Sequence, residues 1–126
     1  MYSVGIDMVE IARIKKSMKN PRFLNFILGE KEYEQLKNKN FISQSVAANF
    51  CAKEAFAKAV GTGFRGLNIK EVQILRNEFG RPYVFLSGKA LEMWGKGEYE
   101  FSVSLTHTKE FASAVVICFK NEPKKE

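Results

Sequence analysis

Apolar residues recur at different spacings in the two halves of this chain. Across residues 10–60 they are mostly three or four positions apart, which is the period of an amphipathic helix. Across residues 72–119 they alternate with polar residues or form short continuous runs, as β-strands do. Helices followed by antiparallel strands predict an α+β fold, with an antiparallel sheet, one long central helix and short N-terminal helices.

Glycine, proline and asparagine residues divide the helical half into segments. Apolar spacing within these segments predicts helices over residues 10–20, 22–28, 30–39 and 43–60. The last segment is rich in alanine, the strongest helix former, with Ser43 as its expected cap and Gly61 as its stop. We therefore expect the long helix to form the centre of the fold.

Strands are predicted at the N-terminus and through the second half of the chain. Apolar runs and alternations favour strands over residues 2–9, 72–76, 82–86, 99–105 and 111–119, with a short helix after Ser87. Gly80 supplies the special backbone angle of a hairpin, and residues 106–109 are expected to form a turn. We predict one domain over residues 1–120 and a charged tail over residues 121–126.

Composition describes an ordinary globular chain with excess positive charge. Of 126 residues, 45% are hydrophobic and 27% charged, and 20 basic against 14 acidic residues give a net charge of +6, which favours an acidic partner. Cys51 and Cys118 stand far apart in apolar surroundings, which favours core positions over a disulfide or a zinc site. The sequence shows no signal peptide and no apolar run of about 18 residues, so we expect a cytoplasmic protein without membrane insertion.

One face of the predicted long helix combines charge with small and apolar residues. Glu54 and Lys58 lie about one turn apart on it and point toward Gly61, Thr62 and Gly63. A carboxylate for a metal, a lysine for a phosphate and a loop with free N–H groups suit a nucleotide-like ligand. A surface ion pair followed by an ordinary helix stop explains the same residues without any ligand.

Two further polar residues stand at the ends or edges of predicted elements. Asp7 interrupts the apolar strand 2–9, either as a site residue or, with Glu10, as part of a capping box for the next helix. His107 is the only histidine, and a lone histidine in a turn is usually just exposed. Asp7, Glu54 and Lys58 supply what Mg²⁺ and phosphate oxygens require, provided that the first strand lies beside the long helix.

The first predicted helix and the turn after it present a basic face. Its residues are Arg13, Lys15, Lys16, Lys19 and Arg22. A solvated helix face explains them, and so does a docking surface for an acidic partner. A nucleic-acid-binding module is an alternative, although no RNP-like or helix-turn-helix signature accompanies the charge. A Mg²⁺-dependent phosphohydrolase that uses the same carboxylates is a third hypothesis.

An ordered set of motifs resembles one enzyme family. The motifs are Gly5-Ile-Asp7 with Glu10 and Arg13, Phe50-Cys-Ala-Lys-Glu-Ala-Phe-Ala-Lys58, Gly61-Thr-Gly63, Gly80-Arg-Pro-Tyr83, Val103-Ser-Leu-Thr-His107 and Ala112-Ser-Ala-Val-Val116. They span nearly the whole chain and resemble the holo-[acyl-carrier-protein] synthases, the short 4′-phosphopantetheinyl transferases. The resemblance implies the fold of that family. It also implies Mg²⁺-dependent transfer of 4′-phosphopantetheine from coenzyme A to a serine of apo acyl carrier protein, releasing 3′,5′-ADP, in fatty acid biosynthesis.

The resemblance also implies roles for individual residues. Asp7 and Glu54 match the Mg²⁺ ligands, and Lys58 matches the lysine that contacts the pyrophosphate. The positions that match coenzyme-binding residues are Lys58, Gly61, Thr62, Gly63, Arg81, Pro82 and His107. Glu54, directly or through a metal-bound water, is the first candidate for the base that accepts the serine proton, and His107 is the second.

Two expectations concern other chains. Acyl carrier proteins are acidic, so the resemblance makes the basic face a docking surface for that protein rather than for nucleic acid. The resemblance also implies a homotrimer with active sites at the subunit interfaces. One position departs from the family, because relatives have an arginine where this chain has Asn49. Arg65 and Lys53 are the nearby cations that could replace it.

Overall fold

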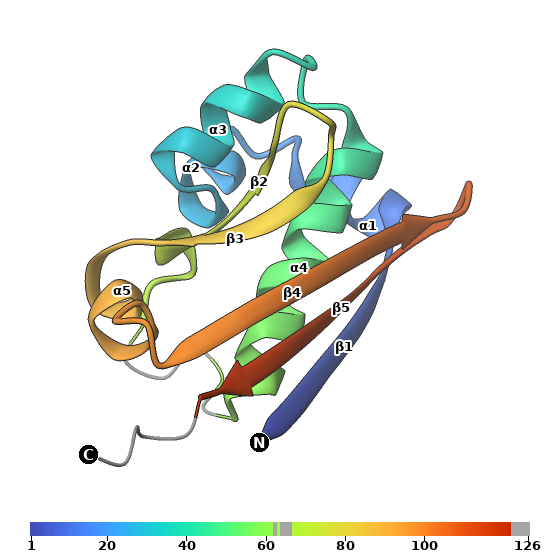
Figure 1. Ribbon diagram of the computed structural model, residues 1–126. Helices are drawn as coiled ribbons and strands as arrows, with labels where there is room; N and C mark the ends of the chain where they lie inside the picture. Colours follow the sequence, from blue (N-terminus) through green and yellow to red (C-terminus); the bar gives the residue numbers. More distant parts are fainter. Residues whose placement is uncertain (62, 64–66, 122–126) are drawn as a thin grey trace, which may run out of the picture.

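Helix α4 (Ser43–Val60) lies against one face of a three-stranded antiparallel sheet (Figure 1). The computed structural model describes residues 1–61, 63 and 67–121. The sheet contains β1 (Tyr2–Glu10), β5 (Phe111–Lys120) and β4 (Tyr99–His107), in that order. The other elements are α1 (Ile11–Ser17), α2 (Phe23–Ile27), α3 (Glu30–Lys37), η1 (Ile69–Glu71), β2 (Val72–Arg76), β3 (Pro82–Leu86) and α5 (Gly88–Trp94). The predicted α+β class with a long central helix is confirmed.

Strand β1 is held close to α4 by its small residues. A β-carbon on Gly5 would lie 1.9 Å from the carbonyl oxygen of Ala55, so only glycine allows this approach. The Ser3 hydroxyl donates a hydrogen bond of 2.6 Å to the carbonyl oxygen of Ala59. Because side chains alternate along a strand, Asp7 faces the helix side together with Ser3 and Gly5. The prediction that the first strand lies beside the long helix is therefore correct.

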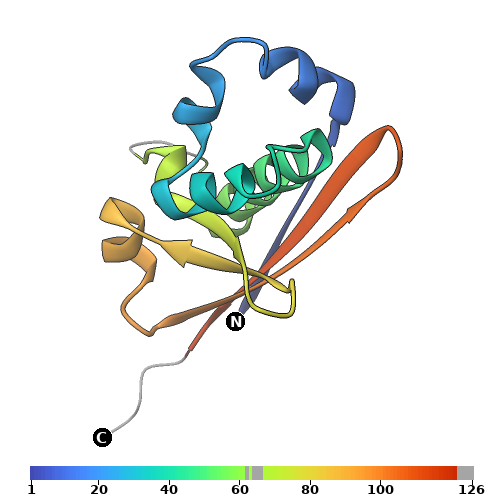
Figure 2. The ribbon, with the colours of Figure 1, turned by 90° about the horizontal axis from the view of Figure 1, so that it is seen from above.

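The hairpin of β2 and β3 forms a second, two-stranded sheet rather than part of a single sheet. Gly80 has a φ of 80°, as its position in the turn predicted. Strand β2 contacts α3 and α4, and β3 runs beside β4. Figure 2 shows the helices gathered on one side of the three-stranded sheet. This arrangement places the hairpin turn beside the carboxyl end of β4.

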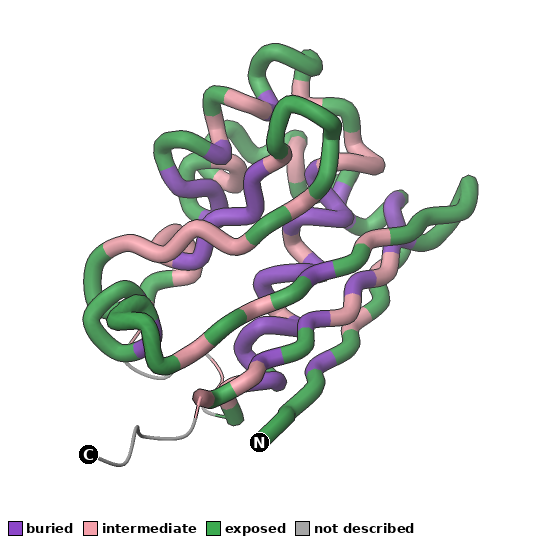
Figure 3. Tube along the Cα trace, viewed as in Figure 1, coloured by how far each residue is buried: buried purple, intermediate pink, exposed green. Residues whose placement is uncertain are grey.

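A buried polar cluster joins α3, α4 and β2. The Lys53 ammonium lies 2.5 Å from the Glu32 carboxylate, and both side chains are fully buried (Figure 3 shows buried segments along α4). Lys53 also donates to the carbonyl oxygens of Ile69 and Val72, at 3.1 and 2.8 Å. Burial raises the pKa of the Glu32 carboxyl and lowers that of the Lys53 ammonium, while their mutual attraction opposes both changes. The cluster ties three elements together.

Several expected boundaries were wrong. Helix α4 begins at Ser43, so Ile42 occupies the cap position and Ser43 does not cap it. Glu10 precedes α1 without a side-chain cap bond, and Asp7 lies inside β1, so the two residues form no capping box. Strand β4 continues to His107, because this residue pairs with Ala112 of β5. The expected turn over residues 106–109 therefore begins two residues later.

Three smaller observations complete the fold. Both cysteines are buried and free, as their apolar surroundings predicted. Of the expected charged tail, Asn121 lies within the described residues and its backbone N–H donates to the carbonyl oxygen of Glu98 at 2.7 Å. In the part of the chain that the structure describes, no helix combines the length and the apolar character needed to cross a membrane.

Candidate active site

The structure brings together the three residues predicted to hold metal and pyrophosphate. Asp7 comes from β1, and Glu54 and Lys58 come from α4. The Lys58 ammonium lies 3.3 Å from Asp7 Oδ1 and donates to the carbonyl oxygen of Ile6 at 2.9 Å. Asp7 and Glu54 line one pocket of about 270 Å³ together with Arg13 and Phe50. We call this the acidic pocket.

The two carboxylates of the acidic pocket, Asp7 and Glu54, repel each other. Burial raises the pKa of Glu54, and the negative charge of Asp7 raises it further, while Lys58 lowers it. A cation placed between the two carboxylates would relieve their repulsion. Carboxylate oxygens are the ligands that Mg²⁺ prefers, so the donor set fits this ion.

Asp7 and Glu54 provide only part of a magnesium coordination shell. Among the described residues, no group of three or more His, Cys, Asp or Glu side chains is arranged to hold a metal. Magnesium usually keeps several waters and is bound through one or two carboxylates plus phosphate oxygens of a substrate. The pair therefore suits an ion that arrives with a phosphorylated substrate better than a fully protein-bound structural metal.

A second pocket gathers the other predicted coenzyme-binding side chains. Arg81 and Pro82 of the hairpin and His107 at the end of β4 line a pocket of about 480 Å³. Arg76 and the hydroxyl residues Ser45, Ser102, Ser104 and Thr106 also line it, and the described lining residues include no aspartate or glutamate. We call this the basic pocket. Two guanidinium groups, a histidine and several hydroxyls without a carboxylate suit an anionic ligand.

The acidic and basic pockets do not meet within one chain. They share no lining residue. Asp7 pairs with Ala114, which pairs with Leu105, so β5 separates the strand of Asp7 from the strand of His107. Two strand spacings amount to roughly 10 Å. In one chain, His107 therefore lies away from the Asp7–Glu54 pair.

The glycine turn after α4 differs from its predicted form. The Gly61 N–H donates to the carbonyl oxygens of Ala57 and Lys58 at 3.1 and 3.2 Å, and the Gly63 N–H donates to that of Ala57 at 3.3 Å. These bonds satisfy the last carbonyl groups of the helix, which need donors. The prediction of free N–H groups is thus wrong for both glycines. Thr62 lies outside the described residues.

The basic face borders the acidic pocket. Arg13 lines that pocket, and the other residues of the face, Lys15, Lys16, Lys19 and Arg22, are also exposed. Lys16 and Arg22 line a shallow surface hollow together with Phe26, a large apolar side chain that is 71% exposed. The face therefore combines positive charge with an accessible aromatic ring, immediately beside the acidic pocket.

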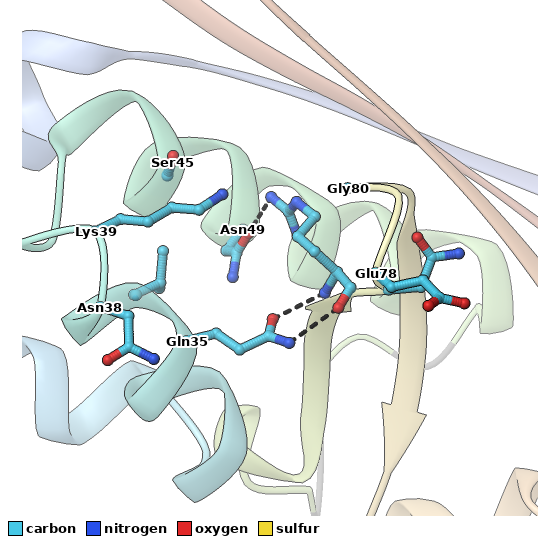
Figure 4. Close-up of a pocket in the computed structure, with 10 residues that line it drawn as sticks. Gln35, Asn38, Lys39, Ser45, Asn49, Glu78 and Gly80 are labelled. Carbon is cyan, nitrogen blue, oxygen red and sulfur yellow. Dashed lines mark hydrogen bonds between the residues drawn. The ribbon is translucent and has the colours of Figure 1, made fainter.

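Asn49, where the resemblance led us to expect an arginine, is almost fully buried. Its amide donates to Glu32 Oε2 at 3.0 Å and to the carbonyl oxygen of Ile74 at 3.1 Å. Its Oδ1 accepts a hydrogen bond of 2.7 Å from Arg76 Nη2 (Figure 4, dashed line at Asn49). Lys53 cannot replace a surface cation, because it is buried against Glu32. The other candidate, Arg65, lies outside the described residues.

Arg76 is the site residue that the sequence interpretation missed. It ends β2, opposite Pro82 in the register, and lines the basic pocket together with Arg81. The hairpin was predicted correctly, so pairing its strands would have placed Arg76 beside Pro82. Its hydrogen bond to Asn49 depends on contacts between α4 and β2, which no local pattern encodes.

Comparison with known proteins places the chain in a family. Residues 3–117 match the family model described as the 4′-phosphopantetheinyl transferase superfamily. The chain therefore belongs to this superfamily of transferases. The motif resemblance and the fold expected from it are confirmed.

Individual relatives are similar over nearly their whole length. A holo-[acyl-carrier-protein] synthase from Clostridium botulinum (strain Eklund 17B / Type B) is 43% identical over 115 residues, which cover 90% of this chain and 94% of the relative. The crystal structure of the Neisseria meningitidis synthase has a TM-score of 0.84 at 32% identity, covering 94% and 98% of the two chains. The Bacillus anthracis synthase, solved in complex with CoA (3′,5′-ADP), has a TM-score of 0.78 at 31% identity, covering 95% and 96%.

Proposed function

We propose that this protein transfers 4′-phosphopantetheine from coenzyme A to a serine of apo acyl carrier protein in a Mg²⁺-dependent reaction of fatty acid biosynthesis. The serine oxygen forms a bond to the phosphorus that bears pantetheine. The bond from that phosphorus to the bridging oxygen breaks, and 3′,5′-ADP leaves with this oxygen. The observation that carries the proposal is that Asp7 and Glu54 line one pocket and that Lys58 lies within ion-pair distance of Asp7, in a chain of this family.

Asp7 and Glu54 in the acidic pocket and Lys58 beside it have different roles, set by their charges. Asp7 and Glu54 would hold Mg²⁺, which when bound supplies neutralisation of charge on the pyrophosphate. Lys58 places an exposed ammonium beside the same pocket, where it can contact phosphate oxygens. Glu54 is also the first candidate for accepting the serine proton, because burial and Asp7 raise its pKa above that of an ordinary carboxyl. His107 remains the second candidate.

The carrier protein would dock on the basic face. Acyl carrier proteins are acidic, and this face lies next to the acidic pocket where the serine must arrive. Opposite charges mainly speed the encounter and fix the orientation of the two proteins. Phe26 adds apolar contact area, which exposed charge pairs do not supply.

We also propose that the enzyme works as a homotrimer. The face of the sheet away from α4 exposes the apolar side chains Tyr2, Val4, Ile6 and Met8, which are 63% to 73% exposed. Ile117 of β5 continues this apolar face. An apolar sheet face of this kind favours burial against another protein.

A second copy of this chain on the apolar sheet face would explain why the site residues are divided between two pockets. The acidic pocket lacks Arg81 and His107, which lie in the basic pocket of the same chain. A ring of three copies would join the acidic pocket of one subunit to the basic pocket of the next, because head-to-tail contacts close into cyclic assemblies.

Mass spectrometry of a carrier protein tests the proposed reaction. Purified enzyme, coenzyme A, Mg²⁺ and apo acyl carrier protein should yield a carrier protein heavier by one phosphopantetheine group, and a metal chelator should prevent the change. Replacement of the acceptor serine by alanine is the matched control. Several apo carrier proteins left unmodified would overturn the proposal. Release of phosphate or pantetheine from coenzyme A without a protein acceptor would indicate the phosphohydrolase instead.

A further inference from the structure

Lys58 contacts the strand that carries Asp7, although most of its side chain is exposed. Its ammonium group donates a hydrogen bond of 2.9 Å to the carbonyl oxygen of Ile6 and lies 3.3 Å from Asp7 Oδ1. An ammonium has three N–H donors, so these contacts use two of them. A positive charge thus lies on one oxygen of a carboxylate that a metal ion would also use.

Of the two partners in this ion pair, Lys58 is the one with room to move. The backbone of Asp7 is paired with Ala114 of β5, and its carbonyl oxygen accepts a hydrogen bond of 3.0 Å from the Ser113 hydroxyl. The Lys58 side chain is 58% exposed and carries its charge on a flexible stem of four carbons. A change in their contact would therefore be a movement of the lysine.

A divalent cation and the Lys58 ammonium compete for Asp7. Mg²⁺ binds oxygen ligands at about 2.1 Å, so an ion on either oxygen of Asp7 would lie close to the ammonium. Like charges at such short range repel each other even in water, and the repulsion doubles for a divalent ion. Glu54 lies one helical turn from Lys58 and attracts both cations, so it does not remove this repulsion. The lysine therefore opposes binding of the metal alone.

A pyrophosphate group changes this balance. Its oxygen atoms offer the ammonium several charge-assisted hydrogen bonds in place of one. Exposed ion pairs such as Lys58–Asp7 contribute little to stability, so the lysine loses little when it leaves Asp7. Once the ammonium has moved to the pyrophosphate, both oxygens of Asp7 are available to the metal.

We propose that Lys58 couples metal binding to coenzyme A binding: it pairs with Asp7 until coenzyme A arrives, then moves to the pyrophosphate and leaves Asp7 to the divalent cation. The inference rests on the proposed function and adds an order to it, because the metal binds together with coenzyme A rather than before it. By linkage, the metal raises the affinity for coenzyme A by the same factor as coenzyme A raises the affinity for the metal.

Binding of Mn²⁺ measures this coupling without any turnover. Mn²⁺ uses the same kinds of oxygen ligand as Mg²⁺, and the electron paramagnetic resonance signal of the free ion decreases as it binds. The ion is titrated into the full-length protein with and without saturating coenzyme A. Carrier protein is left out, so no transfer occurs. The ratio of the two dissociation constants for Mn²⁺ is the coupling factor.

Lys58→Met removes the competing ammonium from an exposed pair, so the protein should stay folded. We expect the affinity for Mn²⁺ alone to rise by about fivefold or more, because both the competition and the repulsion are lost. The affinity in the presence of saturating coenzyme A should change much less, so the coupling factor should fall. Oxygen atoms of coenzyme A that bind the metal directly act in both proteins, and the difference between them isolates the lysine.

Arg13→Met is the matched control. Arg13 lines the same pocket and carries the same charge, but within the described residues it forms no ion pair. The substitution should therefore shift the two dissociation constants for Mn²⁺ by the same factor and keep the coupling factor of the wild type.

Three outcomes would overturn the inference in distinguishable ways. Unchanged or weaker binding of Mn²⁺ alone by Lys58→Met would mean that the lysine does not compete for Asp7. An equal gain with and without coenzyme A would mean that the ammonium stays in place and acts as a fixed charge. A wild type that binds no coenzyme A would remove the coupling together with the proposed transferase function, whereas the first two outcomes are compatible with transfer.

Discussion

Lys53 and Glu54 are neighbours on α4, yet they belong to opposite kinds of environment. Lys53 is fully buried and surrounded by the Glu32 carboxylate and two backbone carbonyl oxygens. Glu54 faces the acidic pocket beside Asp7 and the partly exposed Lys58. Both residues belong to clusters of acids and lysines, and only one cluster is open to a ligand.

The difference lies in how many hydrogen-bonding positions are already filled. Glu32 accepts bonds from the backbone N–H groups of Gly29 and Ile74 and from the amide of Asn49, in addition to Lys53. The Asp7–Lys58 pair is exposed, with 58% of the Lys58 side chain and 20% of the Asp7 side chain accessible. A saturated buried pair specifies a fold, whereas an exposed, incompletely compensated one can bind a metal and a phosphate.

The largest effect is expected for Glu54→Gln. The substitution keeps the shape of the side chain and removes one of two metal-binding carboxylates, so transfer should fall by roughly 10³-fold or more. The far-ultraviolet circular dichroism spectrum and the melting temperature should stay close to those of the wild type. Glu92→Gln, an exposed acid on α5, is the control. Turnover that equals the wild type would remove Glu54 from the metal site.

The next effect is on stability. Lys53→Met removes one partner of the buried pair and leaves the Glu32 carboxylate without its cation, which should lower the free energy of unfolding by about 3–5 kcal/mol. Urea denaturation measures this change. Lys58→Met should change the same quantity by less than about 1 kcal/mol, because exposed pairs contribute little. Equal losses for the two variants would contradict the distinction between the clusters.

When activity is measured instead of stability, Lys58→Met should have a larger effect than Lys53→Met. Loss of a cation beside the pyrophosphate is expected to lower kcat/KM by about tenfold to a hundredfold while the protein remains folded. Steady-state assays over a range of coenzyme A concentrations provide the value. Lys70→Met changes the charge by the same amount outside both pockets and should leave kcat/KM near that of the wild type. A Lys58 variant with normal kinetics would exclude a contact with the pyrophosphate.

The smallest expected effect is a change in the pKa of Glu54. Glu54 should titrate above the ordinary value of 4.5, and Asp7→Asn should lower its pKa because a neighbouring negative charge is removed. Because the pKa of Glu54 is higher in the folded than in the unfolded chain, its protonated form stabilises the folded state. This contribution is lost as pH rises from the unfolded pKa through the folded pKa. NMR titration of the carboxyl group in metal-free protein measures the pKa. If the pKa of Glu54 does not change in Asp7→Asn, the two carboxylates do not interact.

Local patterns predicted the elements well because their causes are local. Alternation along residues 99–105 and the alanine-rich run up to Val60 fixed the strand and the helix to within a few residues. Gly5 also behaved as expected, since its neighbours in space leave no room for a β-carbon. Boundaries failed where pairing decides them, as at His107, which belongs to β4 only because Ala112 lies opposite.

The site was less predictable, because its parts depend on contacts between distant segments. Nothing local distinguishes buried Lys53 from exposed Lys58, since burial of the former depends on Glu32 and on backbone carbonyl groups of η1 and β2. The same holds for Arg76, whose orientation depends on Asn49. The separation of the acidic and basic pockets follows from the strand order β1-β5-β4, which the sequence pattern did not specify.

A complementation assay tests most directly whether one active site is built from two copies. Glu54→Gln damages only the acidic pocket, and the double variant Arg76→Gln/Arg81→Gln damages only the basic pocket. When the two damaged chains are co-expressed in equal amounts and assemble at random, one of the three interfaces in each mixed ring, and about a quarter of all interfaces, should join two intact pockets. Activity should then return to about a quarter of the wild type. Activity no greater than that of the separate variants would contradict a shared site.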